Sequence, residues 1–140
     1  MANLIQVFDG HNDTLLKLEM AARHGRPVNF SDRLEGVDID LPKAREGGFA
    51  GGLFAMFTPS SIENFHHKFD HNDPKNFMPV DQKKALDFTL AMFSRLRRLA
   101  RDMPDTLAIC SDSEDVRRTI AQGRIAAVPC LLYTSDAADD

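Results

Sequence analysis

The sequence predicts an α/β fold built on a parallel sheet or barrel, and three observations support this. Short apolar runs recur along the 140 residues and are continuous enough to form strands buried on both faces, at residues 4–8, 49–57, 106–110 and 124–128. Segments with helical periodicity separate these runs. With 43% hydrophobic residues and a net charge of −4, the chain has the composition of one folded domain rather than of a disordered protein.

The composition also argues against several classes of partner and location. The basic segment at residues 95–101 is short and has the spacing of a solvated helix face, so we expect no nucleic-acid partner. No apolar stretch reaches the roughly 18 residues of a membrane-spanning helix, and no signal peptide is seen. We therefore expect a cytoplasmic protein without a transmembrane segment. Cys110 and Cys130 are too few for a disulfide framework and are expected to be small buried side chains.

The N-terminal region is predicted to start with a strand over residues 4–8. This apolar run is followed by Asp9 and Gly10, which are typical of a turn that closes a buried strand. Residues 14–23 are expected to form one or two turns of helix. The polar residues that follow, through Asp38, are expected to be a loop.

A short helix and a second strand are predicted next. Asp40 can cap the helix, Pro42 lies in its first turn, and Gly47 or Gly48 can end it. The run 49–57 then forms a buried strand, with glycines where a neighbouring backbone must come close.

The C-terminal half is predicted to alternate between helix and strand. The clearest helix covers residues 81–103, because apolar residues recur there at spacings of three and four, namely Ala85, Phe88, Met92, Leu96 and Leu99. A strand over 106–110, a helix over 113–123 capped by Ser111, and a strand from residue 124 complete the pattern.

His11 and Asp13 are the first candidate functional residues. Side chains two residues apart on an extended segment point the same way, so this pair can direct an imidazole and a carboxylate to one point. Active sites of parallel α/β barrels lie at the carboxyl ends of strands, and histidine with a carboxylate is a common set of zinc ligands. In the alternative interpretation, Asp9, Asn12 and Asp13 form only turn and cap hydrogen bonds and His11 is exposed.

Residues 60–79 form a long polar segment that contains a second group of potential ligands. This group consists of His66, His67, Asp70, His71 and Asp73. No apolar run fixes these residues at a strand end, and ligands on an unsupported loop are poorly preorganised for metal binding. A loop that covers a polar substrate is therefore the favoured interpretation, with a metal site as the alternative.

Three blocks of sequence resemble the membrane dipeptidase (renal dipeptidase) family. They read VFDGHNDTLL, DIDLPKAREGGFAGGLFAMF and SDSEDVRRTIAQGRIAAV, and the match extends over residues 7–128. The resemblance implies a (β/α)8 barrel with two zinc ions that hydrolyses dipeptides and some related amides. It also implies that His11 and Asp13 are ligands of the first zinc, and that no catalytic residue lies within this chain.

The resemblance further implies that part of the barrel is missing. The family's bridging glutamate would fall at about Leu132, and its later zinc-binding and catalytic histidines lie farther on. A complete barrel typically has about 250 residues. We therefore expect an incomplete (β/α)8 barrel, with residues 1–129 as the N-terminal portion of a metal-dependent dipeptidase and residues 130–140 as a non-native tail. The chain alone is expected to be inactive and to self-associate.

Two alternative functions remain from the sequence. One is another metal-dependent amidohydrolase, because fold alone does not determine the substrate. The other is a small non-catalytic α/β binding domain, in which His11 and Asp13 are turn residues.

Overall fold

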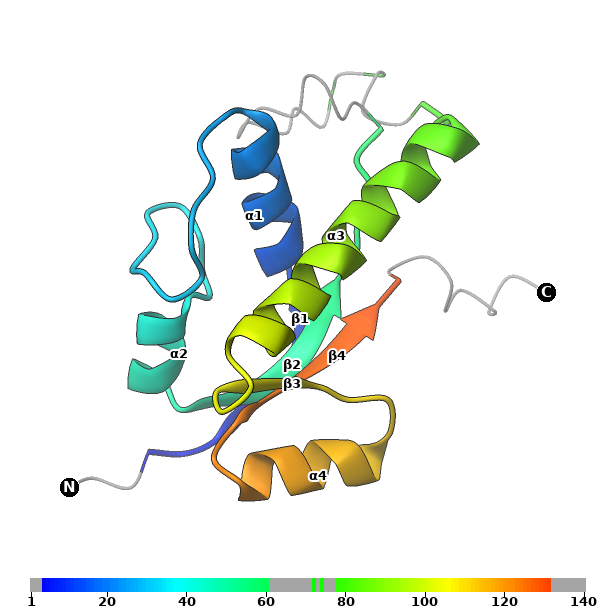
Figure 1. Ribbon diagram of the computed structural model, residues 1–140. Helices are drawn as coiled ribbons and strands as arrows, with labels where there is room; N and C mark the ends of the chain where they lie inside the picture. Colours follow the sequence, from blue (N-terminus) through cyan, green and yellow to red (C-terminus); the bar gives the residue numbers. More distant parts are fainter. Residues whose placement is uncertain (1–3, 61–71, 73, 75–77, 132–140) are drawn as a thin grey trace.

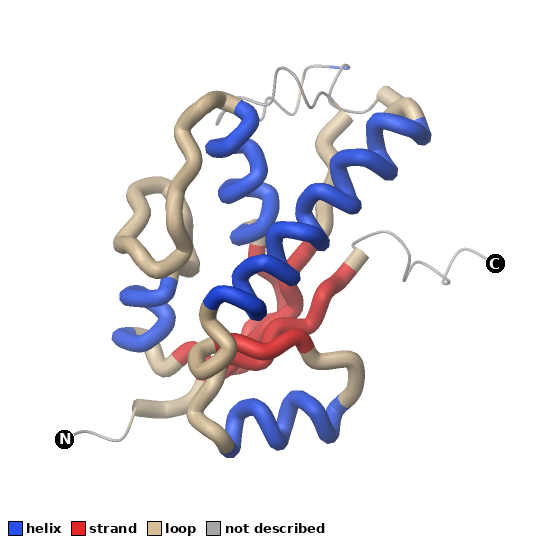
Figure 2. Tube along the Cα trace, in the orientation of Figure 1, coloured by secondary structure: helices blue, strands red, loops and turns tan. Residues whose placement is uncertain are grey.

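The computed structural model describes residues 4–60, 72, 74 and 78–131. A four-stranded parallel sheet lies at its centre (Figures 1 and 2). The strands are β1 (Val7–Asn12), β2 (Phe49–Ala55), β3 (Leu107–Ile109) and β4 (Ile125–Cys130), in the order β1-β2-β4-β3. The predicted parallel α/β architecture is confirmed.

Four helices connect and flank the strands in the described part of the chain. They are α1 (Thr14–Arg23), α2 (Leu41–Glu46), α3 (Gln82–Asp102) and α4 (Ser113–Ala121). Helices α1 and α3 lie side by side, and α1 packs on β2 while α3 packs on β3 (Figure 1). Helix α4 packs against β4 and α2 against β2. No helix in the described residues is long and apolar enough to cross a membrane.

Helix α3 provides the central part of the core. Phe88, Met92 and Leu96 have no exposed surface and join a cluster that includes Leu15, Phe54 and other buried side chains. These three residues are spaced four apart, so they lie on one face of the helix. The periodicity of the sequence predicted this face, and the structure confirms it.

Helix α2 begins as predicted. The carboxylate of Asp40 accepts hydrogen bonds from the backbone N–H of Lys43 and of Leu34, both at 2.8 Å, and it also pairs with the Lys43 ammonium. Burial by itself would raise the pKa of the Asp40 carboxyl. The hydrogen bonds from Leu34 and Lys43 outweigh burial and hold the pKa below its usual value.

The first strand differs from its prediction. It covers residues 7–12 rather than 4–8, because pairing with β2 starts at Val7 opposite Phe49 and continues to Asn12 opposite Phe54. Asp9 and Gly10 therefore lie inside the strand and do not close it. The hydrogen bonds to β2, rather than the apolar run, determine where the strand lies.

Helix α4 has a different cap from the one expected. Asp112, not Ser111, is the N-cap, and its carboxylate accepts hydrogen bonds from the backbone N–H of Glu114 and Asp115. Either residue type can cap a helix. Strand β3 ends at Ile109, one residue before the predicted end, and α4 starts at Ser113 as predicted, so at this start only the capping residue differs.

The first residues of β1 and the segment before it are poorly covered. Ile5 and Val7 are 84% and 48% exposed, and Phe8 is 44% exposed. Strand β2, by contrast, is mostly buried, because β1 and β4 pair with its two edges and α1 and α2 pack on it. Within the described residues, β1 therefore has an apolar surface without a packing partner.

Candidate metal centre

His11 and Asp13 come together at the carboxyl end of β1. His11 Nε2 lies 3.4 Å from Asp13 Oδ1, and the two side chains are 45% and 40% exposed. His11 is the last residue but one of the strand, and Asp13 is the N-cap of α1. The predicted convergence of these two side chains is therefore present, although the strand that carries them is longer than expected.

Asp13 does not act as the cap that its position suggests. The other three described helices also begin after an aspartate, and in each of them the aspartate side chain accepts a backbone N–H of the first turn: Asp40, Asp81 and Asp112. The side chain of Asp13 accepts none. Aspartate is among the preferred capping residues, so the missing cap leaves the Asp13 carboxylate available beside His11.

Asn12 lies between the two candidate ligands and points the other way. Its Nδ2 donates to Leu53 O of β2 and to Asp9 Oδ2, both at 3.1 Å, and its Oδ1 accepts from Thr14 N at 3.4 Å. The side chain of Asn12 therefore ties the end of β1 to β2. Asp9 and Asn12 contact each other rather than the side chains of His11 or Asp13.

The donor atoms of this pair suit zinc. An imidazole nitrogen and a carboxylate oxygen are standard zinc ligands, and a zinc site needs three or four protein ligands in all. In the ranges that the structure describes, no group of three or more His, Cys, Asp or Glu side chains is arranged to hold a metal. The pair therefore fits part of a zinc site, and further ligands would have to come from elsewhere.

Several sequence predictions lie outside the described residues. These are the histidine-rich group of His66, His67, Asp70, His71 and Asp73, and the position of Leu132. Of the predicted tail, Cys130 closes β4, where its carbonyl accepts from Met56 N at 2.8 Å. The domain boundary after residue 129 stays a prediction.

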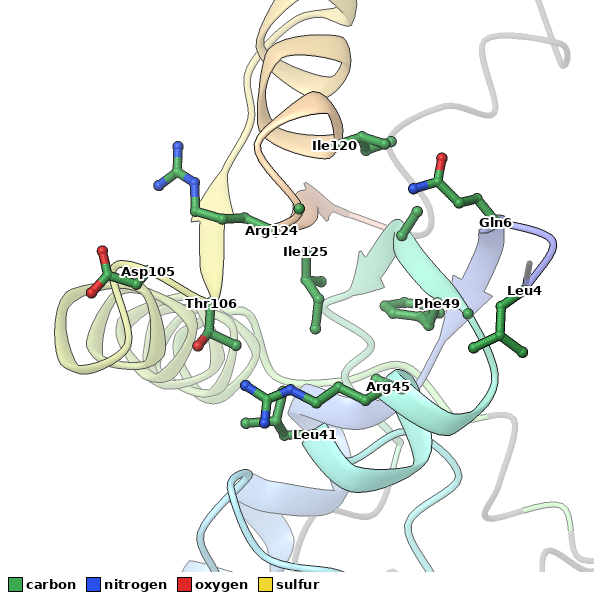
Figure 3. Close-up of a pocket in the computed structure, with 14 residues that line it drawn as sticks. Leu4, Gln6, Leu41, Arg45, Phe49, Asp105, Thr106, Ile120, Arg124 and Ile125 are labelled. Carbon is green, nitrogen blue, oxygen red and sulfur yellow. The ribbon is translucent and has the colours of Figure 1, made fainter. Parts of the chain in front are cut away.

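A cavity of about 300 Å³ lies at the other end of the sheet (Figure 3). It is bounded by α2, the first residues of β2, and the turn from α4 into β4, and its polar side chains are Gln6, Arg45, Asp105, Thr106 and Arg124. Because the strands are parallel, this is the amino end of the sheet, whereas His11 and Asp13 lie at the carboxyl end. The cavity is therefore separate from the candidate ligands, and the sequence did not indicate it.

The chain matches the family model for membrane dipeptidase (peptidase family M19) over residues 1–136. It is 32% identical over 133 residues to an Acinetobacter calcoaceticus protein described as "Uncharacterized protein in PQQ-III 3'region". That match covers 89% of this chain but 39% of the relative. The chain therefore spans about two-fifths of the length of this relative.

Solved structures show the same partial match. A metallopeptidase from Rhodobacter sphaeroides, crystallised with a phosphinate mimic of the dipeptide L-Ala-D-Ala, is 29% identical with a TM-score of 0.68. The dipeptidase AC is 30% identical with a TM-score of 0.65. Each comparison covers 91% of this chain, and it covers 38% and 36% of the respective solved chains. The probable dipeptidase PvdM from Pseudomonas aeruginosa, at 24% identity, a TM-score of 0.64 and 28% of its chain covered, shares the fold.

These relatives place the four-stranded sheet in a larger architecture. Dipeptidases of this family are TIM barrels, and the present chain corresponds to part of one. His11 and Asp13 then lie at the carboxyl end of a barrel strand, which is where barrel enzymes have their active sites. On its sequence and its fold, the chain belongs to the membrane dipeptidase family, peptidase family M19.

Proposed function

We propose that this chain is the N-terminal portion of a zinc-dependent dipeptidase, and that the complete protein hydrolyses dipeptides. The family match supports the reaction class. The dipeptide mimic named for the Rhodobacter sphaeroides relative supports the substrate class. The partial coverage of these relatives supports an incomplete barrel.

One observation carries the proposal: the Asp13 carboxylate lies beside His11 instead of capping α1. A capping carboxylate stabilises the start of a helix by about 1 kcal/mol, so its absence here runs against local stability. Residues that depart from local structural preferences such as helix capping are expected mainly at functional sites. Metal coordination accounts for this departure, because a carboxylate that binds zinc must direct an oxygen lone pair at the metal rather than at the end of the helix.

In this proposal, the two residues hold the metal and do not transfer protons. His11 would donate its Nε2 lone pair as a neutral imidazole, and Asp13 would donate Oδ1 as a carboxylate. When bound, zinc supplies a water of lowered pKa and polarises the scissile carbonyl. The remaining ligands, including a bridging glutamate at the position of Leu132, would belong to the complete protein.

The test uses the protein with its native continuation. His11→Ala and Asp13→Ala are each expected to lower zinc content and dipeptide hydrolysis together, because each removes a metal ligand. His24→Ala and Asp105→Ala are matched controls, since both residues are exposed, His24 follows the far end of α1, and Asp105 lines the cavity at the amino end of the sheet. Elemental analysis measures the zinc content, and an assay with Gly- and Ala-containing dipeptides measures the hydrolysis rate.

Each outcome bears on a different part of the proposal. Wild-type zinc content and hydrolysis rate in both ligand variants would reject the metal assignment. Normal zinc dependence with hydrolysis of other amides, but not of dipeptides, would retain the metal centre and favour another metal-dependent amidohydrolase.

A further inference from the structure

Asn12 is the buried residue between the two candidate ligands. Its exposed fraction is 7%, and its amide makes three hydrogen bonds that join the end of β1, the start of α1 and strand β2. We infer that Asn12 is a positioning residue that keeps the Asp13 carboxylate away from the end of α1 and directed toward His11. The inference rests on the proposed function for the identity of the metal.

Burial separates Asn12 from its two neighbours. The side chains of His11 and Asp13 are 45% and 40% exposed, while Asn12 is buried. The pairing of β1 with β2 is irregular between Asp9 and Asn12, so the bond from Asn12 Nδ2 to Leu53 O, rather than regular alternation, holds this arrangement against β2. Rotation of the chain at residue 12 would break that bond.

Asn12 also contacts the start of α1. The backbone N–H groups of the first helical turn need acceptors, and an aspartate at the N-cap ordinarily accepts from the second or third of them. Here Asn12 Oδ1 accepts from Thr14 N, the first of them, at 3.4 Å. Asn12 therefore satisfies the first of these groups from the residue before the cap, while the side chain of Asp13 accepts none of them.

The position of Asn12 needs a donor for Leu53 O and Asp9 and an acceptor for Thr14 N on the same short side chain. Only the asparagine amide offers both at this length. An aspartate would keep the acceptor but would lose the donor and repel the Asp9 carboxylate.

The first experiment uses the 140-residue chain without metal. In Asn12→Ala, the Asp13 side chain is no longer held in its direction. It is expected to rotate and accept hydrogen bonds from backbone N–H groups in the first turn of α1. Amide hydrogen exchange at Leu15 and Leu16, the second and third residues of the helix, should therefore become slower than in wild type. A residue that only stabilises the fold would make exchange faster when it is removed. Faster or unchanged exchange at both amides would overturn the inference.

The second experiment measures zinc affinity by chelator competition in the protein with its native continuation. Removal of a group that orients a ligand typically weakens metal binding by about 10- to 100-fold, and we expect this range for Asn12→Ala. Asp81→Ala is the matched control, because it removes the cap of α3, where Asp81 accepts from Lys84 N at 3.0 Å. The control should lower the melting temperature and leave zinc affinity unchanged.

The inference and the proposed function can fail separately. If Asn12→Ala binds zinc as tightly as wild type while wild type hydrolyses dipeptides, the inference is wrong and the function stands. If wild type hydrolyses no dipeptide while Asn12→Ala still weakens zinc binding at least tenfold, the inference stands and the function is wrong.

Discussion

Arg95 of α3 donates two hydrogen bonds to Glu19 of α1, from Nη2 at 2.7 Å and from Nε at 3.1 Å, both to Oε2. Arg23 donates to the other carboxylate oxygen at 2.9 Å, and its guanidinium carbon lies 4.7 Å from the centre of the Phe88 ring. Glu19 is 6% exposed. Since α1 starts directly after Asp13, this contact fixes the helix that follows the candidate ligands against the rest of the fold.

We expect Arg95→Ala to destabilise the chain by about 3 kcal/mol. Removing one partner of a buried ion pair leaves the other charge buried with fewer hydrogen bonds. Urea unfolding measures the change in the free energy of unfolding. The matched control is Arg101→Ala, which breaks an exposed pair with Asp102 and should change stability little. Equal effects of the two substitutions would show that the Glu19 contact does not join the helices.

Glu19 should also make stability depend on pH. Burial would raise the pKa of its carboxyl, but the hydrogen bonds and charges of Arg95 and Arg23 outweigh burial and hold the pKa below its ordinary value. The stabilising contribution is therefore fully present above the unfolded-state pKa of about 4.3, and it is lost as the pH falls through the lower folded-state pKa. The stability difference between wild type and Glu19→Gln should be constant near neutral pH and shrink in acid. A constant difference down to about pH 3 would contradict this prediction.

Gly51→Ala should be strongly destabilising. A Cβ atom at this position would lie 2.4 Å from the carbonyl oxygen of Ala126 and 2.9 Å from its Cβ, so β2 and β4 would have to separate. Overpacking a tight site costs about 1–3 kcal/mol, and a clash with backbone should reach the upper part of that range. Gly10→Ala is the control, because a Cβ there meets no heavy atom within 4 Å. Thermal unfolding of both variants tests this prediction. Similar melting temperatures would mean that β2 and β4 do not approach so closely at Gly51.

The 140-residue chain should not hydrolyse dipeptides, even with added zinc. His11 and Asp13 provide two ligands, and the described residues bring no third His, Cys, Asp or Glu to them. The exposed Ile5, Val7 and Phe8 should also bind a hydrophobic dye and promote association.

Gel filtration, dye fluorescence and a peptidase assay test these expectations together. Ile5→Asn with Val7→Thr should reduce dye binding without changing the circular dichroism spectrum, since both side chains are largely outside the core. Zinc-dependent turnover by a monomer would contradict the role given to the absent ligands.

The sequence alone determined the elements whose signals are local. The spacing of Phe88, Met92 and Leu96 predicted the buried face of α3, because a helix repeats every 3.6 residues whatever it packs against. Asp40 and Pro42 predicted the start of α2, and Gly47 or Gly48 its end, for the same reason, since caps act within one turn; the structure ends the helix at Gly47. The spacing of His11 and Asp13 likewise predicted that their side chains converge.

Only the tertiary structure decided which distant segments pair. The extent of β1 follows from its hydrogen bonds to β2, and β4 lies between β2 and β3 although it is last in the chain. Asn12 contacts Leu53, 41 residues away, and Glu19 contacts Arg95, 76 residues away. Such contacts depend on the register of strands and on helix packing, which no local pattern encodes. The sequence therefore indicated which residues could bind a metal, and the fold decided that Asn12 accepts from the first N–H group of α1 while the Asp13 side chain accepts from none.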